Sequence, residues 1–533
     1  MATTQLRRIG RPLLPVLAAL MLVVGLLGLG VSPTAGTRAR PAGATVTLSV
    51  MTQNIFYGGD DYDLRTGRFC RVSDGCPQAL RRLARVIARA GADVVGVQEP
   101  ERNIDRLARL LGWYGSARAH VVSRYPLVDP PGSRGRYVFV EPTPGRVLAV
   151  ANVHLPSTPY GPYEVRDGAT RRDLRRVELT TRMPAVTGTL RALRRLGRHG
   201  IPVVLTGDFN SPSHLDWTSA VSAVRSDVPY PFQWPVSRAI AEAGFTDSYR
   251  EVHPDPVARP GFTWTPGGPE TAAHEVFDRI DWVLHAGRVE TLDSRLVGES
   301  GGPDVDLGVK APYPSDHRGV VSTMAVTLAR SPVLVSPAVR RLTTGDPLTV
   351  TYHTPRRGAE RVALVRRHAS GRTELVRSKP VHPSRRRDGT VRFPTTRLHP
   401  GRYDVVLIAR HGRRLSSSPV WAYRPGTSAT VETTRRHYAV GDPIRVRWTH
   451  APGMGLDWVG VFRCRQGRCA SNDGYLLYAY TRTAIEGHRT IGPTAATLEG
   501  AVSWPLPSGT YVTRLLVDDS YVDLAQSPRF SIE

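Results

Sequence analysis

The sequence predicts an α/β layered domain followed by two all-β, immunoglobulin-like sandwich modules. From Val46 to Leu328, short apolar runs typical of strands alternate with amphipathic segments typical of helices. Such alternation is the pattern of strands and helices packed in layers. After Ala329 the helical periodicity disappears, and β-branched runs separated by Gly and Pro indicate β-sandwiches.

The elements of the α/β region can be placed in order along the chain. A helix is predicted over Gln78–Ala90, because its apolar residues recur every three or four positions. Helices are also predicted over Ile104–Leu111 and over the basic stretch Arg171–Leu196, which Pro184 should interrupt. Six apolar runs are predicted as strands: Val46–Gln53, Asp93–Gln98, Val147–Val153, Pro202–Thr206, Ile280–Leu284 and Gly319–Val326.

The β-rich half contains an internal repeat. The run Gly345–Pro347 aligns with Gly441–Pro443, and Pro400–Tyr403 aligns with Pro507–Tyr511. Each copy is about 100 residues long, which is the size of an immunoglobulin-like module. The predicted organisation is therefore a signal peptide at 1–44, an α/β domain at 45–330, and sandwich modules at 331–424 and 425–533.

Charge is distributed unevenly along the chain. The formal net charge is +25, from 71 basic and 46 acidic residues, and residues 331–424 hold 20 of the basic and five of the acidic ones. Arg clusters occur there at 356–357, 366–367, 385–387 and 413–414. A field of this sign attracts anions, so we expect residues 331–424 to bind an anionic polymer or surface such as nucleic acid, cell-wall polymer or acidic lipid. A solubilising surface in an Arg-rich chain is the alternative.

The first 44 residues have the features of an export signal. Basic residues at Arg7, Arg8 and Arg11 precede an uncharged run from residue 13 to residue 31, and Ala42–Ala44 fits the small-residue cleavage pattern. Left uncleaved, the run is long enough to anchor the chain in a membrane. The prediction is a secreted, extracellular protein, associated with the cell surface in the uncleaved case.

Four cysteines form two local pairs. Cys70 lies close to Cys76, and Cys464 lies close to Cys469. In an oxidising compartment these pairs predict two short-loop disulfides. A zinc site would instead need all four thiolates to converge from distant parts of the chain.

Polar motifs stand at the ends of the predicted strands. Taken singly, a carboxylate after a strand caps or solvates it, a histidine packs, and a Gly-Asp pair forms a turn. Six such motifs in one domain are hard to explain by turns alone. They are Thr52–Ile55 (TQNI), Gln98-Glu99, Asn152–Leu155 (NVHL), Gly207–Asn210 (GDFN), Asp278–Trp282 (DRIDW) and Ser315–His317 (SDH).

The order of these motifs resembles the endonuclease/exonuclease/phosphatase superfamily. That superfamily includes deoxyribonuclease I, exonuclease III-like repair nucleases, inositol polyphosphate 5-phosphatases and neutral sphingomyelinases. The resemblance covers Val46–Leu328, just over half of the chain. It implies an α/β, four-layer fold in which a two-sheet sandwich is flanked by helices. It also implies hydrolysis of a phosphate-ester substrate with Mg²⁺ or Mn²⁺ as cofactor.

The resemblance implies a metal site built from oxygen ligands. Glu99 matches the principal metal ligand of the superfamily, Asn54 lies beside it, and Asp316 is expected to contribute. Mg²⁺ is usually held by one or two carboxylates together with waters, which suits these residue types.

The resemblance also assigns the catalytic residues. Asp208 matches the general base that deprotonates the attacking water, and Asn210 matches the residue that orients this water. His154 and His317 match the histidines that donate to phosphate oxygens or assist the leaving group. Asp281 or Asp316 is expected to hold His317, and a nearby carboxylate favours its charged form. For Asp281, a structural ion pair with Arg279 is the alternative.

Loops after the motifs carry aromatic and cationic side chains that we expect at the rim of the site. These residues can stack on bases, sugars or inositol, or they can pack the loops. Ser211-Pro212 follows the GDFN motif where inositol 5-phosphatases have Tyr-Arg, which disfavours that subfamily. By contrast, the Asp247–Arg250 stretch resembles the repair nucleases. The predicted substrate-binding residues are Tyr160, Tyr163, Arg166, His214, Trp217 and Trp264.

The leading hypothesis is an exported metal-dependent phosphoric ester hydrolase that acts as a phosphodiesterase or nuclease. A phosphomonoesterase and a phospholipase C-like enzyme are the alternatives within this class. A surface-binding protein with a catalytically silent first domain is the alternative from another class. No obligate protein partner is inferred.

Overall fold

The computed structural model describes residues 44–63, 66, 68–70, 76–266, 275–354, 359–381, 387–493, 496–497 and 504–533. Residues 43–533 belong to one compact unit. The predicted signal peptide lies outside the described residues except for Ala44, as do Arg356, Arg357, Arg385 and Arg386. Within the described part of the chain, no helix is both long and apolar enough to cross a membrane.

The first half of the chain forms two seven-stranded sheets, each mixing parallel and antiparallel pairs. The first sheet has the order β14 (Leu307–Val309), β13 (Val289–Glu299), β15 (Gly319–Thr327), β1 (Thr45–Asn54), β4 (Val94–Gln98), β6 (Val121–Ser123) and β5 (Tyr114–Ser116). The second has the order β11 (Thr246–Asp247), β12 (Asp281–Ala286), β10 (Val203–Asp208), β9 (Arg146–His154), β8 (Val138–Thr143) and β7 (Leu127–Val128), with β16 (Ala329–Arg330) paired to β9.

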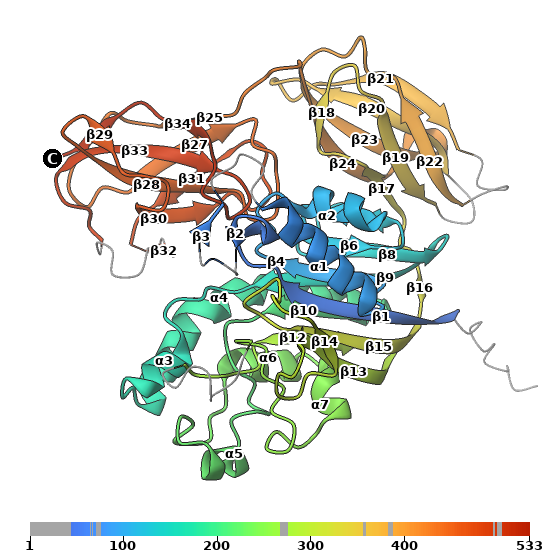
Figure 1. Cartoon of the computed structure of the whole chain (residues 1–533). Helices are drawn as coiled ribbons and strands as arrows, with labels where there is room; N and C mark the ends of the chain where they lie inside the picture. The colour runs from blue at the N-terminus through green and yellow to red at the C-terminus, as the bar shows by residue number, and fades with distance from the viewer. Residues whose placement is uncertain are drawn as a thin grey trace, which may run out of the picture. The chain divides into compact units, whose positions relative to one another are not determined.

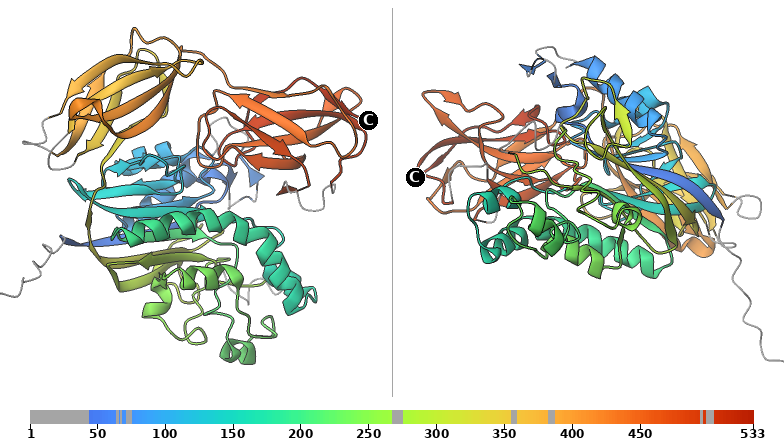
Figure 2. Two further views of the ribbon diagram at one scale, coloured as in Figure 1. Left: turned by 180° about the vertical axis from the view of Figure 1, so that it is seen from behind. Right: turned by 60° about the horizontal axis from the view of Figure 1, so that its bottom comes forward.

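Helices cover the outer face of each sheet. Helices α1 (Pro77–Arg89) and α2 (Ile104–Leu111) pack on the first sheet through one buried apolar cluster. Helices α4 (Arg171–Arg198) and α6 (Pro235–Glu242) pack on the second sheet through another. A third cluster lies between the sheets, with Val50 and Val320 from one meeting Val150 and Val283 from the other. These layers are visible in Figures 1 and 2 and confirm the predicted four-layer, two-sheet sandwich.

Local sequence explains where these helices form. The apolar positions of α1 that recur every three or four residues are buried, as the pattern predicts. Helix α2 ends at Gly112, whose left-handed φ of 70° suits a helix C-terminus. Helix α4 begins with a capping box made by Thr170 and Asp173. The expected interruption at Pro184 is wrong, because α4 runs through this residue as one helix over 28 residues.

Three short helices and a small hairpin complete the first half. The helices α3 (Gly161–Arg166), α5 (Ser219–Val224) and α7 (Ser248–Val252) lie in the connections after β9, β10 and β11. A single 3₁₀ turn, η1 (Tyr57–Gly59), follows β1 directly, and β2 (Tyr62–Asp63) then pairs with β3 (Arg68–Phe69). These connections leave the strand ends and carry the residues of the site described below.

The second half contains two β-sandwiches. In the first, one sheet joins β17 (Leu334–Pro337), β19 (Leu348–His353) and β22 (Asp388–Phe393), and the other joins β18 (Arg341–Thr343), β24 (Arg414–Tyr423), β23 (Gly401–Ala409), β20 (Ala359–Arg367) and β21 (Thr373–Pro380). In the second, one sheet joins β25 (Thr430–Thr433), β27 (Ile444–Thr449) and β31 (Gly487–Ile491). Its other sheet contains β26 (His437–Tyr438), β35 (Phe530–Ile532), β33 (Gly509–Leu516), β28 (Trp458–Arg465), β30 (Tyr475–Tyr480) and β32 (Ala496–Thr497), with β29 (Arg468–Cys469) and β34 (Asp523–Gln526) at its sides.

The two sandwiches share a detail that fits the sequence repeat. The hydroxyl of Tyr403 donates to the His399 carbonyl at 2.7 Å, and that of Tyr511 donates to the Pro507 carbonyl at 2.5 Å. A tyrosine that bonds to the backbone a few residues upstream is a recurring feature of immunoglobulin-like sandwiches. Both predicted disulfides, Cys70–Cys76 and Cys464–Cys469, are present.

Candidate active site

Strand register brings the polar motifs to the same ends of the two sheets. In the second sheet, β10 pairs Asp208 with His154 of β9 on one side and with Asp281 of β12 on the other. In the first sheet, β1 pairs Asn54 with Gln98 of β4, so that Glu99 lies next to Asn54. Residues far apart in the chain therefore meet because neighbouring strands end together.

Asp208 lies at the centre of this group and is almost fully buried. One of its carboxylate oxygens accepts the Asn210 backbone N–H at 2.9 Å. The other accepts the Asn54 Nδ2–H at 3.1 Å, and it lies 3.6 Å from His317 Nε2 and 3.7 Å from His154 Nε2. Two imidazoles and an amide thus converge on a single carboxylate oxygen.

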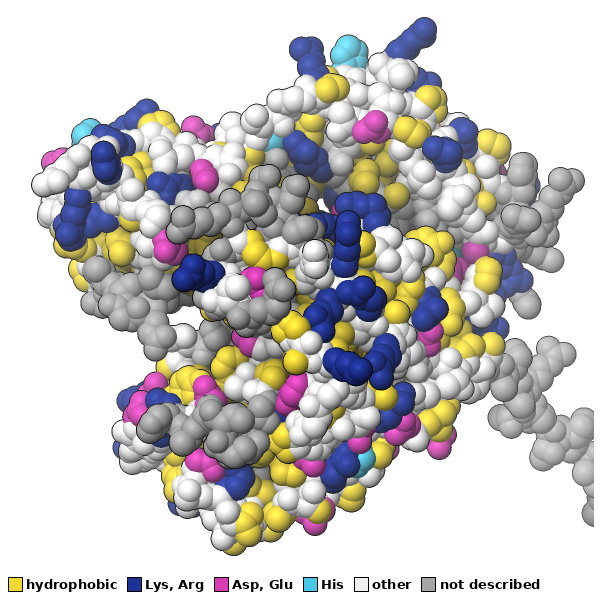
Figure 3. All heavy atoms as spheres, in the orientation of Figure 1, with side chains coloured by type: hydrophobic (Ala, Val, Ile, Leu, Met, Phe, Trp, Pro, Cys, Tyr) yellow, Lys and Arg dark blue, Asp and Glu magenta, His cyan; other side chains and the backbone are white. Residues whose placement is uncertain are grey.

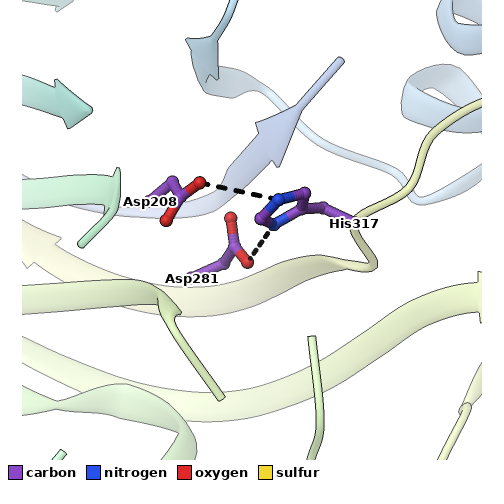
Figure 4. A group of neighbouring side chains, drawn as sticks. All are labelled: Asp208, Asp281 and His317. Carbon is purple, nitrogen blue, oxygen red and sulfur yellow. Dashed lines mark hydrogen bonds and ion pairs between the residues drawn. The ribbon is translucent and has the colours of Figure 1, made fainter. Parts of the chain in front are cut away.

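His317 is held by a buried carboxylate. Its Nδ1 lies 2.9 Å from Asp281 Oδ2, while its Nε2 faces Asp208, as Figure 4 shows. Burial alone lowers the pKa of His317, but the charges of Asp281 and Asp208 outweigh it and raise the pKa well above its ordinary value. The arrangement therefore favours the imidazolium, with one ring nitrogen directed at the centre of the site.

Arg279 does not take Asp281 as its partner. Instead, the Arg279 guanidinium makes ion pairs with Asp216 at 2.9 Å and Asp247 at 2.8 Å. The structural alternative for Asp281 thus does not describe this site. Asp247, which begins the stretch resembling repair nucleases, also caps α7 by accepting the Tyr249 and Arg250 backbone N–H groups.

Glu99 has a strained backbone and is tied to β1. Its φ is 52°, a left-handed conformation that a non-glycine residue adopts only when its surroundings hold it. One carboxylate oxygen accepts the Asn54 Nδ2–H at 3.0 Å, and the other accepts the Tyr57 backbone N–H at 3.0 Å. The Glu99 side chain remains 24% exposed, so a ligand can reach it.

Asn54 forms hydrogen bonds to its own turn and to two carboxylates of the site. Its amide oxygen accepts the Phe56 backbone N–H at 2.9 Å, and its amide nitrogen donates to Glu99 and to Asp208. The group that faces the two carboxylates is therefore the NH₂. The NH₂ of Asn54 thus orients these carboxylates, and its role as a metal ligand stays a prediction.

Comparison with known proteins identifies the family of the first domain. The family model described as the Endonuclease/Exonuclease/phosphatase family matches residues 51–317. The chain belongs to this family. Members of the family are in general phosphoester hydrolases that use divalent metals.

Three relatives illustrate the similarity. An uncharacterized protein of Caenorhabditis elegans is 28% identical over 300 residues, which is 51% of this chain and 90% of the relative. An endonuclease/exonuclease/phosphatase of Beutenbergia cavernae is 19% identical, with a TM-score of 0.32, 70% of this chain covered and 99% of the other. An AP endonuclease of Archaeoglobus fulgidus is 16% identical, with a TM-score of 0.31, 52% of this chain covered and 98% of the other.

The carboxylates at the strand ends of the first domain are suited to binding a divalent cation. Asp316 has a buried carboxylate oxygen without a hydrogen-bond partner among the described residues. Burial raises the pKa of Asp316 to about 7, and although His317 opposes this, the charges of Glu99 and Asp208 add to it. Potential ligand atoms of Asp208, Asp281 and His317 also lie within 4.8 Å of one another. Crowded, partly unpaired carboxylates of this kind are stabilised by a cation, and oxygen ligands suit Mg²⁺ or Mn²⁺.

Asn210 occupies a strained position after β10. Its φ is 47°, and its side-chain amide donates to the Leu155 carbonyl at 3.0 Å. This bond joins the end of β10 to the end of β9, and together with the backbone bond to Asp208 it fixes the loop. Asn210 is 8% exposed and lies directly beside the carboxylate that it is predicted to assist.

The predicted rim residues are only partly grouped, with the rings of Tyr160 and Tyr163 4.8 Å apart. Trp217 is fully buried, and its indole N–H donates to Asp278 at 3.1 Å, so the expected rim position is wrong for this residue. Tyr160 is 9% exposed and donates to the same carboxylate at 3.3 Å. Both side chains therefore brace the loop that leads into β12.

Of the other predicted rim residues, Tyr163 and Arg166 join Tyr160 in one group, whereas His214 has other neighbours. Tyr163 donates to Glu275 at 2.7 Å, with the Arg166 guanidinium 4.6 Å above its ring. The ring of His214 lies 2.9 Å from the Ser237 hydroxyl. Trp264 is the member placed at the site, since its ring centroid is 4.9 Å from that of His317.

Two positioning residues were not identified from the sequence. Tyr57 holds Glu99 through its backbone N–H. The Thr263 hydroxyl accepts the backbone N–H groups of Ile280 and Asp281 at 3.0 and 3.1 Å, which fixes the start of β12. The bond from Tyr57 to Glu99 uses a backbone N–H, which every residue type except proline has, so the residue type gives no signal for it. Thr263 lies in a loop that was predicted to matter only through its aromatic residue Trp264.

Proposed function

We propose that this chain is an exported phosphodiesterase that uses Mg²⁺ or Mn²⁺ and a water activated by Asp208. The observation that carries the proposal is the convergence of His154 Nε2, His317 Nε2 and Asn54 Nδ2 on one oxygen of buried Asp208. A carboxylate surrounded by hydrogen-bond donors, beside a second carboxylate at Glu99, provides a base and a cation site within one group of side chains.

In this mechanism Asp208 accepts a proton from the attacking water. Asn210 keeps the Asp208 carboxylate in place through its backbone N–H. The imidazolium of His317 donates a hydrogen bond to a non-bridging oxygen of the phosphate, and Asp281 supports its positive charge. His154 Nε2 lies 3.7 Å from the same Asp208 oxygen, where it can donate to a phosphate oxygen or to the leaving oxygen as the ester P–O bond breaks.

Two carboxylates of the site are the residues that would hold the cation. Glu99 and Asp316 offer carboxylate oxygens, and Asn54 keeps Glu99 oriented. When bound, the cation supplies positive charge to the phosphate and lowers the pKa of a coordinated water. Mg²⁺ and Mn²⁺ both accept such oxygen ligands.

Charge favours diesters over monoesters as substrates. Four carboxylates, Glu99, Asp208, Asp281 and Asp316, surround the two histidines of the site. A phosphomonoester carries close to two negative charges at neutral pH, whereas a diester carries one. The monoanion therefore meets less repulsion, and nucleic acid or a phospholipid headgroup remains the class of substrate to test.

The full chain should be assayed with bis(4-nitrophenyl) phosphate and 4-nitrophenyl phosphate, each with Mg²⁺, Mn²⁺, Ca²⁺ or EDTA. We expect metal-dependent release of nitrophenol that is faster from the diester. DNA, RNA, inositol phosphates, sphingomyelin and nucleotides then identify the natural class. Equal rates with EDTA and with Mg²⁺ would rule out the metal-dependent mechanism.

Export and anion binding belong to the same proposal. The two disulfides are consistent with an oxidising, extracellular environment. Within residues 331–424, which hold most of the basic excess, Arg410, Arg413 and Arg414 are exposed near η2 (Arg410–Gly412), where they can contact an anionic polymer. The outer face of α1 adds the exposed side chains of Arg81, Arg85 and Arg89, and dark blue side chains lie over this helix in Figure 3.

A further inference from the structure

His154 has carboxylates on both sides of its ring. Its Nε2 lies 3.7 Å from Asp208 Oδ2 and 3.9 Å from Glu99 Oε1, inside the site. Its Nδ1 lies 3.9 Å from Oδ2 of Asp519, in the loop between β33 and β34 of the last sandwich. The first domain therefore does not supply all the carboxylates around its own histidines.

The loop that carries Asp519 is held in an unusual conformation. Asp518 and Asp519 have φ values of 48° and 64°, both in the left-handed region that non-glycine residues rarely adopt. The Asp518 backbone N–H donates to Asp457 Oδ1, and the Asp519 backbone N–H donates to the Leu456 carbonyl, each at 3.1 Å. Tyr480 donates its hydroxyl to Asp519 Oδ1 at 2.8 Å, which leaves Oδ2 facing His154. Strain that is held by this many contacts indicates a constrained, functional position.

Buried contacts also fix this loop to the first domain. Asp518 Oδ1 lies 2.6 Å from Nε2 of buried His120, and Asp518 Oδ2 accepts the Arg102 backbone N–H at 3.1 Å. Nearby, the Arg118 guanidinium donates to the carbonyls of Gly453 and Thr483 at 3.1 Å each. Because buried charged groups are costly unless paired, these contacts set the place of Asp519 relative to His154.

The two histidines of the site have matching surroundings. His317 directs Nε2 at Asp208 and Nδ1 at Asp281, and His154 directs Nε2 at Asp208 and Nδ1 at Asp519. A carboxylate behind one ring nitrogen orients an imidazole and supports its charge when the other nitrogen acts.

From this match we infer that Asp519 is a positioning residue for His154, so that the active site is completed by the last sandwich module. The inference rests on the proposed phosphodiesterase function. At 3.9 Å, the contact between Asp519 Oδ2 and His154 Nδ1 is too long for a direct hydrogen bond, and it acts by placing a carboxylate behind the ring.

The test compares Asp519→Asn with Asp519→Glu and with the matched control Asp523→Asn. Asp523 is exposed in β34 of the same module and accepts a hydrogen bond from Asn472. In the full chain with Mg²⁺ and bis(4-nitrophenyl) phosphate, Asp519→Asn should lower kcat about tenfold or more with KM within about twofold. Asp519→Glu should recover most of kcat, and Asp523→Asn should match the wild type. A kcat for Asp519→Asn within about twofold of wild type would overturn the inference.

A spectroscopic readout separates this inference from the proposed function. In full chain labelled with ¹⁵N-histidine, the His154 ring signals are identified as those lost in His154→Gln. Asp519→Asn should shift the Nδ1 signal of His154, and Asp523→Asn should leave it in place. An unchanged Nδ1 signal in Asp519→Asn overturns the inference even if the enzyme is active. A shifted signal in a chain that hydrolyses no ester supports the contact and rejects the phosphodiesterase proposal.

Discussion

Replacing Asp208 by Asn gives the sharpest test of the proposed chemistry. The substitution keeps the side-chain shape but removes both the charge and the ability to accept the proton of a water. Loss of a general base lowers turnover by about 10²–10⁴-fold, or roughly 3–5 kcal/mol of transition-state stabilisation. We expect a fall in kcat of this size at saturating Mg²⁺.

The structure also indicates what Asp208→Asn does to folding. The Asn210 backbone N–H still finds an oxygen, but the new NH₂ faces the Asn54 amide, and losing that charged hydrogen bond costs about 1.5–3 kcal/mol. Burial is the main cause of the raised pKa values of Asp281 and Asp316, and the charge of Asp208 adds to it, so removing that charge offsets part of this cost. The variant should therefore remain folded.

The assay combines steady-state hydrolysis of bis(4-nitrophenyl) phosphate with calorimetric titration of Mg²⁺, and it uses exposed Asp105→Asn as the control. Retained Mg²⁺ affinity with lost turnover is the expected pair of results. Turnover within about tenfold of wild type would reject Asp208 as the base. Collapse of Mg²⁺ affinity would instead make Asp208 a metal ligand.

Three further predictions follow from other contacts. Glu99→Gln should reduce activity at least about a hundredfold and weaken Mg²⁺ binding in calorimetry, because it removes a partly exposed ligand charge, and it should lower the melting temperature modestly, because the new NH₂ faces the N–H donor of Asn54 or of Tyr57. Burial alone lowers the pKa of His120, but the charge of Asp518 outweighs this effect and raises the pKa. The His120–Asp518 pair therefore stabilises the fold fully below about pH 6.5, and this stabilisation is lost as the pH rises through the raised pKa of His120. Denaturant unfolding should accordingly show a deficit for Asp518→Asn that is largest near pH 6 and shrinks at alkaline pH; a deficit that grows with pH would contradict this sign. Combined replacement of Arg410, Arg413 and Arg414 by Ala should reduce the salt dependence of DNA binding, by about 0.9 in slope for each lost phosphate contact, while hydrolysis of the small diester stays unchanged.

The local sequence pattern was sufficient to predict the layers of the first domain and the positions of its polar motifs along the chain. The buried positions of α1 recur with helical spacing, and the buried strands β4 and β10 are short apolar runs, so both could be recognised from neighbouring residues alone. The motif residues Asn54, Glu99 and Asp208 follow or end such strands, and strand register then brought them together.

Properties that depend on distant contacts could not be predicted in this way. Helix α4 tolerates Pro184 because its apolar face packs on the second sheet, which a local rule for proline does not consider. The side chain of Trp217 is buried in an apolar cluster with Leu174 and Trp234, and Asp278, 61 positions away, accepts its N–H. The orientation of the Asn54 amide is set by a backbone N–H of its own turn, and residue type alone does not reveal it.

The positive net charge of the chain does not describe the charge at the active site. The excess of basic residues lies in residues 331–424, yet the site itself is rich in carboxylates, with Glu99, Asp208, Asp281 and Asp316 near two histidines. On the proposed mechanism, an anionic substrate should be repelled at the point of reaction unless a cation is bound there, whereas exposed arginines should attract it at a distance. The proposal predicts different responses for the two effects. Added salt should weaken the long-range attraction and slow hydrolysis of a polymer, while chelation of the metal should stop hydrolysis of every ester. A polymer and a small diester assayed side by side thus separate capture from chemistry.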